Sequence, residues 1–589
     1  MDVLDIDSSI LKSVKNKKWR QKPVDPALLD ALSRNSAIPN SIVELLATRK
    51  IPLEEADYYI SPKIKNYLPD PYHLLDMDKA VNFTVDALQK KKKIAVFGDY
   101  DVDGATSAAT LKKFFKELGH DILIYIPDRI KEGYGPNIEA LKYLKEQGAE
   151  VVFTVDCGAV SYDALAEAKK IGLDVIVIDH HIGGEVLPES VAVINPNRID
   201  EKSEYGYLCA AGVVFLFVVA LNQKLKKANL DSVENKKILS LLDLTALGTV
   251  CDVVPLKGLN RAFVSQGIKI IEQATNTGIR ALKQIAGIDD NIDAYHLGFV
   301  LGPRINAGGR VGDASLGANM LSTDNFEEAI QAARALDMHN HERKAIELNI
   351  INQAIQEAAE DRTSNIAFVV GHRWHLGVIG IVAGRLKETF NKPSIVITVT
   401  DGTGKASCRS VPGIDIGSVI HSAKEKGLLI AGGGHAMAAG FTVDSHKIDD
   451  LKDFIRAEIA DDYNKFVAED CEYFDQIISH GIINLNFVSE MIQMGPFGSN
   501  NPQPKFYLKN VNISNAKIVG GDHISCFVSD GNDSKSKFIK AICFRAINSP
   551  VGEILLRNQK NLNIIAQLNI NHWNGNSSAE MNIQDILLD

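Results

Sequence analysis

Residues 91–118 read KKKIAVFGDYDVDGATSAATLKKFFKEL, and their pattern indicates the class of fold. Its apolar beginning (91–98) leads through a turn rich in glycine and aspartate into an amphipathic segment (105–118), which is the pattern of a strand followed by a helix. Further strands are predicted at 121–127, 149–158 and 173–181, and further helices at 137–148 and 162–172. Nearly all-apolar strands that alternate with helices indicate a parallel sheet covered on both faces, and such sheets bind ligands at the carboxyl ends of their strands.

The rest of the chain has patterns of its own. Its beginning is polar, helix-prone and interrupted by prolines. Neither glycine nor proline occurs between Gly317 and Gly371, so we expect one long helix there, or two in line, joining two α/β domains. The last part has short β-rich runs separated by Asp, Asn and Gly turns, which is typical of a small antiparallel barrel. The predicted class is α/β, and the predicted domains are a helical cap (1–70), the parallel-sheet domain (71–324), a connecting helix (325–362), a smaller α/β domain (363–462) and an OB-like barrel (463–589).

Composition excludes several classes of protein. Hydrophobic residues make up 45% and charged residues 23% of the 589 residues, which is ordinary for a multidomain globular protein. The longest apolar run, 210–221, is about half of the ~20 residues that a membrane-spanning helix needs. The N-terminus has neither a basic start nor an apolar core, and the seven cysteines form no CxxC pair. We therefore expect a reduced, cytoplasmic protein, and its net charge of −10 argues against a general nucleic-acid coating protein.

Acidic residues and histidines gather where the predicted strands end. The candidates are Asp99, Asp101 and Asp103 in the first loop, Asp156 after the next strand, Asp179-His180-His181 after the following one, and Asp252 in the segment ALGTVCDVVPL. A single aspartate in such a loop is usually a helix cap. Four clusters in successive loops favour a shared metal site, and carboxylates mixed with imidazole suit Mn²⁺ or Mg²⁺ better than Zn²⁺. No glutamate follows at the calcium-loop position, so an EF-hand is excluded.

A second set of residues is suited to phosphate. The segment GPRINAGGRVGD (302–313) is predicted to be a glycine-rich loop that presents Arg304, Asn306 and Arg310, although an ordinary turn with two surface arginines explains it equally well. In the smaller domain, a GGGH turn allows close backbone approach to a phosphate because glycine has no Cβ. The candidates there are His375, Arg385, Arg409, Ser410, Gly433, Gly434 and His435.

Taken together, DYDVDG, VDCG, VIDHH, TVCDVVPL and GGGH resemble the motifs of the DHH phosphoesterase superfamily, and within it the single-stranded-DNA-specific 5′→3′ exonucleases. The resemblance covers most of the chain. It implies that two divalent cations, Mn²⁺ or Mg²⁺, are held by Asp101, Asp103, Asp156, His180 and Asp252, with Asp156 bridging them, Asp99 as a further candidate, and His181 facing the substrate phosphate. Many superfamily members have a histidine four residues before the first ligand aspartate, where this chain has Phe97.

The predicted function is therefore a two-metal exodeoxyribonuclease that shortens single-stranded DNA from its 5′ end, in DNA repair and recombination. We expect a monomer, with single-stranded DNA as its partner and a helicase and a single-strand-binding protein as further candidates. Cys157 and Cys251 adjoin the expected ligands and are interpreted as small buried residues rather than nucleophiles. Two alternatives stay open. One is a superfamily phosphodiesterase acting on short oligoribonucleotides, cyclic dinucleotides or pyrophosphate, and the other is a non-catalytic DNA-binding scaffold.

Overall fold

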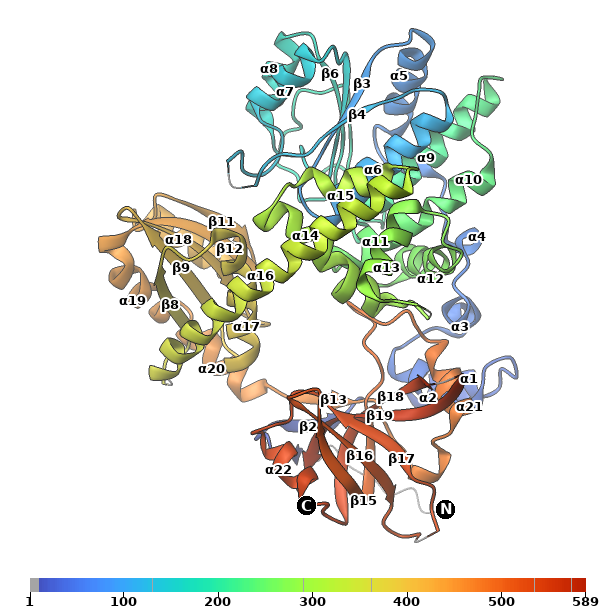
Figure 1. The fold of residues 1–589 in the computed structure, drawn as a ribbon, viewed down its shortest axis with the longest axis vertical. Coiled ribbons are helices and arrows are strands. Elements are labelled where there is room, and N and C mark those ends of the chain that lie inside the picture. The colour runs from blue at the N-terminus through green and yellow to red at the C-terminus, as the bar shows by residue number, and fades with distance from the viewer. Residues whose placement is uncertain are drawn as a thin grey trace. The chain divides into compact units, whose positions relative to one another are not determined.

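The computed structural model describes residues 10–129, 131–289, 291–361, 363–533, 535–573 and 575–588. The chain divides into two compact units (Figure 1). The larger unit comprises residues 68–255 and 266–469, and the smaller comprises residues up to 67, 256–265 and 470 onward. Among the described residues, no helix has both the length and the apolar character needed to cross a membrane.

The larger unit contains the predicted parallel sheet. Its strands lie in the order β4 (Leu123–Tyr125), β3 (Ile94–Gly98), β5 (Val151–Val155), β6 (Asp174–Ile178) and β7 (Ala192–Ile194). Gly98 pairs with Val155, and Val155 pairs with Ile178, so three strands end at one level of the sheet. The residues that follow them therefore emerge side by side at its carboxyl edge.

Helices cover both faces of this sheet, as predicted. The helices are α5 (Met77–Gln89), α6 (Val102–Glu117), α7 (Ile138–Glu146), α8 (Tyr162–Lys170), α9 (Ala210–Lys227), α10 (Asn235–Ser240) and α11 (Leu242–Cys251). One face packs α7 and α8 around Phe97, which stacks on Tyr125 with ring centroids 5.5 Å apart. On the other face the rings of Phe115, Phe153 and Phe217 join α6, β5 and α9. Position 97 is thus occupied by a core side chain.

The glycine-rich segment after this sheet is helical, which corrects the prediction of a loop. It forms α14 (Gly302–Val311), and the neighbouring helices are α13 (Thr277–Ala286) and α15 (Ser315–Ser322). A Cβ atom on Gly309 would lie 2.8 Å from the carbonyl oxygen of Tyr100, and one on Gly308 would lie 2.7 Å from that of Asp313. The glycines therefore allow the helix to pack closely against neighbouring backbone, and they do not mark a turn.

The long helix is confirmed as a single element. It is α16 (Phe326–Glu360), 35 residues long, and Asn325 caps its first turn. At ~1.5 Å per residue it spans roughly 50 Å. It packs against α13, α14 and α15 with its first part and against α17 (Leu376–Phe390) and β8 (Ala367–His372) with its last part (Figure 1).

The smaller α/β lobe has a five-stranded sheet in the order β11-β12-β10-β9-β8. Its remaining elements are β9 (Ser394–Thr400), β10 (Thr403–Arg409), β11 (Ala431–His435), β12 (Ala438–Asp444), α18 (Ile416–Glu425), α19 (Ile448–Glu458) and α20 (Ala460–Glu469). The GGGH segment, predicted as a turn, is the edge strand β11, paired with β12 from Ala431 to His435. A Cβ atom on Gly434 would lie 2.4 Å from the Ala438 carbonyl oxygen, so glycine is required by close strand pairing.

The smaller unit contains the predicted barrel. Strands β15 (Phe506–Val519), β16 (His523–Asp530), β17 (Ile539–Cys543), β19 (Asn576–Leu587) and β18 (Leu562–Trp573) pair in this order, and β18 returns to β15. The same unit holds α1 (Pro26–Ser33), α2 (Asn40–Thr48), α3 (Leu53–Ile60), α4 (Ile64–Tyr67), β14 (Gln476–Ile477), α21 (Leu485–Ile492) and α22 (Pro550–Leu556), and α12 (Gly258–Glu272) supplies residues to both units.

The segment predicted as a helical cap also contains two short strands. They are β1 (Leu11–Lys12) and β2 (Lys18–Gln21), and β2 pairs with β13 (Glu472–Phe474), more than 400 residues later in the chain. Strands of two and four residues carry too little alternation to be recognised from sequence. The residues at which the domains begin and end stay predictions.

Candidate metal centre

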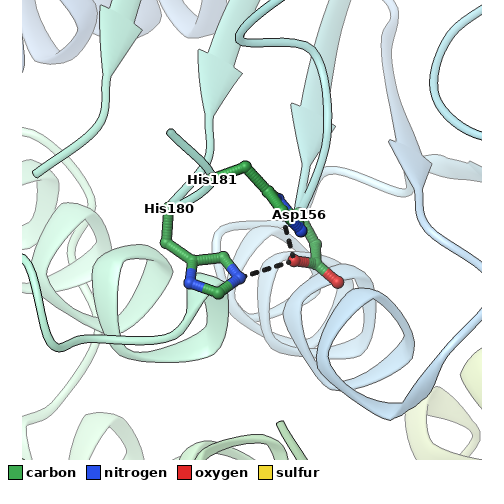
Figure 2. A group of neighbouring side chains, drawn as sticks. All are labelled: Asp156, His180 and His181. Atoms are coloured by element: carbon green, nitrogen blue, oxygen red, sulfur yellow. Dashed lines mark ion pairs between the residues drawn. The ribbon is translucent and has the colours of Figure 1, made fainter. Parts of the chain in front are cut away.

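Five of the predicted residues meet at the carboxyl edge of the parallel sheet. Asp99 follows β3, Asp156 follows β5, and Asp179, His180 and His181 follow β6. The Nε2 atom of His180 lies 3.3 Å from Oδ1 of Asp156, and Nδ1 of His181 lies 3.9 Å from the same oxygen (Figure 2). Figure 2 shows both imidazole rings turned toward this carboxylate.

Two further carboxylates come from helices. Asp252 stands at the C-terminal end of α11, with Oδ2 3.5 Å from Nε2 of His180, and Asp103 lies in the first turn of α6 with Oδ2 3.9 Å from that nitrogen. Three groups of side chains have candidate ligand atoms within 4.8 Å of one another: Asp99, Asp101 and Asp156; Asp103, His180 and Asp252; Asp156, His180 and His181. Asp156 and His180 each belong to two of these groups, so the candidate ion positions share ligands.

The strongest indication of a metal is a set of buried atoms that lack hydrogen bonds. Within the described part of the chain, Oδ1 of Asp99, Oδ1 of Asp156, Nε2 of His180 and Oδ2 of Asp252 have no hydrogen-bond partner. A buried polar atom without a partner costs on the order of 1–3 kcal/mol, and more when the group is charged. All four are of the kinds of atom that bind metals, so divalent cations would satisfy them together. The residues present therefore fit a metal centre.

The electrostatics of these side chains also favour bound cations. Burial, followed by repulsion from Asp101, Asp103, Asp99 and Asp252, holds the pKa of Asp156 well above its usual range. Burial and then Asp103 and Asp101 raise the pKa of Asp252 to about 9. Carboxylates that crowd one another in a buried site need a positive charge to remain ionised together.

The backbone fixes these carboxylates in place. Oδ1 of Asp101 accepts hydrogen bonds from the backbone N–H groups of Asp103 (2.9 Å) and Gly104 (3.1 Å) and thereby caps α6. Asp103 accepts from the N–H groups of Ala210 (2.6 Å) and Ala211 (2.9 Å) at the start of α9. Both aspartates thus act as structural acceptors and still have free lone pairs for a cation. Capping and metal binding are compatible functions of the same side chain.

Asp156 is held in a strained conformation. Its φ is 62°, in the left-handed region that side chains other than glycine, asparagine and aspartate rarely adopt. Strain of this kind costs on the order of 1–3 kcal/mol and concentrates at functional sites. The backbone is therefore bent at the residue that two candidate ligand groups share.

Asp179 lies behind the site and orients His181. Its Oδ1 is 2.8 Å from Nδ1 of His181, and its oxygens accept from the N–H groups of His180 (2.7 Å) and Ala159 (3.0 Å). Burial alone would raise the pKa of Asp179, but the hydrogen bond and charge of His181 lower it overall. The hydroxyl of Tyr134, a residue in the loop after β4, lies 3.0 Å from the same Nδ1. The same hydroxyl lies 3.4 Å from Nε2, so Asp179 and Tyr134 together fix the His181 ring.

A basic cavity of about 820 Å³ lies near this centre, and one of its lining residues, Arg129, lies over the ring of Tyr100, between Asp99 and Asp101. It is lined by Arg129 and Arg310, which belong to the part with the parallel sheet, and by Lys405, Arg409 and β11 of the smaller α/β lobe. None of its described lining residues is acidic. Nη1 of Arg310 donates to the carbonyl of Gly377 at 2.8 Å, and burial together with the charges of Arg129 and Arg343 lowers the Arg310 pKa to about 10. Four cations facing one cavity favour an anion with several charges, such as a nucleic-acid backbone.

The structure divides the residues that were predicted to bind substrate. Those that line the cavity are Arg310, Arg409, Gly433 and Gly434. The others lie outside the lining. Arg304 forms an ion pair with Asp337 (2.9 Å) and Arg385 with Glu388 (3.2 Å), while Nδ1 of His375 accepts from the N–H of Gly377 (3.1 Å) and Nδ1 of His435 from that of Met437 (3.3 Å). Ser410 is buried and donates to the Ile414 carbonyl (2.7 Å), and Asn306 is half-buried on α14. Cys157 and Cys251 are thiols whose pKa is raised by burial, then by nearby aspartates.

Sequence reasoning missed Arg129 and Lys405. Lys405, Ser407 and Arg409 alternate along β10 and therefore share one face of the strand, which is a pattern that the sequence contains. Arg129 belongs to the loop after β4, where a single arginine has no motif in the sequence that distinguishes it from an ordinary surface residue.

The chain is similar to several known proteins. Residues 93–249 match the N-terminal domain of the DHH family, residues 363–461 the DHHA1 domain and residues 474–585 the RecJ OB domain. The single-stranded-DNA-specific exonuclease RecJ of Salmonella typhimurium is 33% identical over 89% of this chain and 92% of its own length, and RecJ of Bacillus subtilis is 29% identical over 96% and 70%. The structure of Thermus thermophilus RecJ with Mn²⁺ matches with a TM-score of 0.78 and 27% identity, covering 96% of this chain and 79% of that one.

Proposed function

The chain belongs to the RecJ family of single-stranded-DNA-specific exonucleases, and on that premise we propose that it hydrolyses the phosphodiester bonds of single-stranded DNA from the 5′ end and releases 5′-mononucleotides. The observation that carries the proposal is the set of buried carboxylate and imidazole atoms without partners at the edge of the parallel sheet. The direction of digestion rests on the family.

Two divalent cations fit the site. Their proposed ligands are Asp99, Asp101, Asp103, Asp156, His180 and Asp252. Oxygen ligands with one imidazole suit Mn²⁺ and Mg²⁺, and the RecJ of Thermus thermophilus has been crystallised with each of these ions. When bound, such a pair supplies an activated water at neutral pH and neutralises charge on the attacking and leaving oxygens. The proposed role of the aspartates is to hold these cations in place; they are Asp101, Asp103, Asp156 and Asp252.

His181 is the proposed contact to the scissile phosphate. Asp179 accepts a hydrogen bond from Nδ1, so Nε2, which lies 3.4 Å from the Tyr134 hydroxyl, is the nitrogen proposed to contact the substrate. The same hydrogen bond and the charge of Asp179 raise the pKa of His181 although burial lowers it, so a protonated ring that donates to a phosphate oxygen is favoured. Tyr134 restricts the ring from the exposed side.

The basic cavity is the proposed path of the DNA backbone. Arg129, Arg310, Lys405 and Arg409 supply positive charge, and Gly433 and Gly434 allow the backbone of β11 to approach a phosphate. The cavity lies near the metal centre, since Arg129 lies over the ring of Tyr100, 4.9 Å from its centroid, and Tyr100 stands between Asp99 and Asp101. Arg304, Asn306, His375, Arg385, Ser410 and His435 stay predictions as substrate contacts.

The wider setting is also part of the proposal. We infer that the OB-like barrel binds the same strand, as barrels of this fold bind single strands in other proteins. We propose that the protein is a cytoplasmic monomer and that it works with a helicase and a single-strand-binding protein. All seven cysteines are free thiols, which supports a reducing compartment.

The test uses the full chain with Mn²⁺ and one DNA sequence in several forms. The substrates are single strands labelled at the 5′ or the 3′ end, the matching duplex, an RNA of the same sequence, and a cyclic dinucleotide. Early release of a labelled mononucleotide from only the 5′-labelled single strand is the expected result. Hydrolysis of only the cyclic dinucleotide or RNA would overturn the proposal in favour of another DHH phosphodiesterase, and DNA binding without any hydrolysis would favour a scaffold.

A further inference from the structure

An aromatic pair is exposed on the segment that leads into α14. Tyr295 is 60% and Phe299 73% exposed, and their rings stack with centroids 5.2 Å apart and planes 25° apart. They lie four residues apart at a π-helical turn, η2 (His296–Leu301), and so project to one side. Two stacked rings that remain in contact with solvent form an unusual apolar surface, and such surfaces commonly mark a binding site.

The turn that carries the pair is packed on the helix of a proposed metal ligand. The thiol of Cys251, the last residue of α11, lies 3.4 Å from the Leu297 carbonyl oxygen. A Cβ atom on Gly302 would lie 2.5 Å from Sγ of Cys251, so only glycine permits this approach. The next residue after Cys251 is Asp252, whose Oδ2 is 3.5 Å from Nε2 of His180. Turns of the π type occur frequently at functional sites.

The same helical segment reaches the basic cavity at its other end. Residues 296–311 are continuously helical through η2 and α14, and Arg310 lines the cavity. Arg310 comes eleven residues after Phe299, which corresponds to roughly 16 Å along the axis. One rigid element therefore carries exposed rings at one end and a phosphate-binding guanidinium group at the other, with a metal-ligand helix packed against it.

We propose that Tyr295 and Phe299 form a stacking platform for a nucleobase of the single strand whose phosphates occupy the metal centre and the basic cavity. The inference rests on the proposed function and adds a subsite to it. Aromatic faces stack on any base, so the platform holds the strand without reading its sequence. A duplex keeps its bases stacked on one another, and so only an unpaired base can use the platform. Continuity with the metal-ligand helix and the cationic cavity favours this occupant over a protein partner.

The test walks a single abasic site along a short 5′-phosphorylated strand, one position at a time. Binding to the full chain is measured by fluorescence anisotropy in EDTA, so that no strand is cut. The expected result is one position near the 5′ end at which loss of the base weakens binding roughly 5- to 150-fold, the range for one stacked base. In Tyr295→Ala and Phe299→Ala this penalty disappears, and in Tyr295→Phe it remains. Tyr143→Ala, which removes an exposed ring on α7, is the matched control and keeps the penalty.

A second measurement uses the unaltered protein, so that folding of the variants does not decide the outcome. A strand with 5-iodouracil at the sensitive position is irradiated in the complex, and the cross-linked peptide is identified by mass spectrometry. Attachment at Tyr295 or Phe299 supports the platform. Attachment only elsewhere, an unchanged penalty in both alanine variants, or no sensitive position at all would overturn it. Hydrolysis of an unmodified strand with Mn²⁺ is measured in parallel: its absence removes the proposed function, whereas hydrolysis without an abasic penalty removes only the platform.

Discussion

Replacement of Lys405 by glutamine is expected to change the salt dependence of DNA binding by a defined amount. Lys405 is exposed on β10 and is one of four cations that line the basic cavity. Each cation that neutralises a phosphate of a single strand contributes about −0.7 to the slope of log K against log salt concentration, so the four together contribute about −2.8. Loss of one contact should make the slope less steep by about 0.7. Between ~50 and ~200 mM salt, the affinity of the variant should therefore fall by a factor about 2.6 times smaller than that of the unaltered protein.

The assay is fluorescence anisotropy of a labelled oligothymidylate in EDTA across a salt series, repeated with a strand of mixed sequence. Lys405→Gln should weaken binding equally for both strands, because a phosphate contact carries no sequence information. Lys424→Gln on α18, an exposed lysine that does not line the cavity, is the matched control and should keep the slope of the unaltered protein. An unchanged slope for Lys405→Gln, or an equal change in both variants, would refute the assignment of the cavity to the DNA backbone.

Three further outcomes are expected. Burial raises the pKa of the Asp243 carboxyl from 3.8 to about 7, so its stabilising contribution is present below pH 4 and is lost as the pH rises through 7. At pH 8, Asp243→Asn should therefore be more stable than the unaltered protein by up to roughly 4 kcal/mol. Equal midpoints of urea unfolding at pH 8 would contradict this. Removal of divalent cations should lower the melting temperature, because an ion at ~100 times its Kd adds about 2.7 kcal/mol to the free energy of unfolding. Identical melting curves with EDTA and with Mn²⁺ would argue against a metal centre. Ser410→Ala should lose about 1 kcal/mol of stability, because the hydroxyl donates to the Ile414 carbonyl; an unchanged DNA affinity in this variant would contradict the prediction that Ser410 is a substrate contact.

Much of the fold could be predicted because it depends on periodicity. Alternating apolar strands and helices predicted the parallel sheet, and the absence of glycine and proline predicted α16. The level ends of β3, β5 and β6 explain why carboxylates separated by more than 50 residues in the sequence meet in space. What the sequence did not indicate was the conformation of its glycine-rich segments. Gly309 and Gly434 serve close packing in a helix and a strand, and composition alone does not distinguish that use from a turn.

The substrate contacts were harder to predict than the candidate ligands. A ligand aspartate follows a buried strand and so has a local signal, whereas a cation that lines a cavity is identified only when two lobes are placed together. Arg304 and Arg310 look equivalent in the sequence, yet Arg304 is neutralised by Asp337 while Arg310 faces the cavity. The strands β1 and β2 were missed for a related reason, since their pairing with β13 depends on residues far along the chain.

If the carboxylates at the sheet edge hold cations for the hydrolysis of single-stranded DNA, Asp156→Asn should abolish that hydrolysis. Asparagine has nearly the same shape and tolerates the positive φ of this position, so the fold should be retained, which circular dichroism can check. The measurement is the release of labelled mononucleotide from 5′-labelled single-stranded DNA with Mn²⁺. The expected result is no release above background while the variant still binds the strand in EDTA. Release at the rate of the unaltered protein would contradict the assignment of the metal centre.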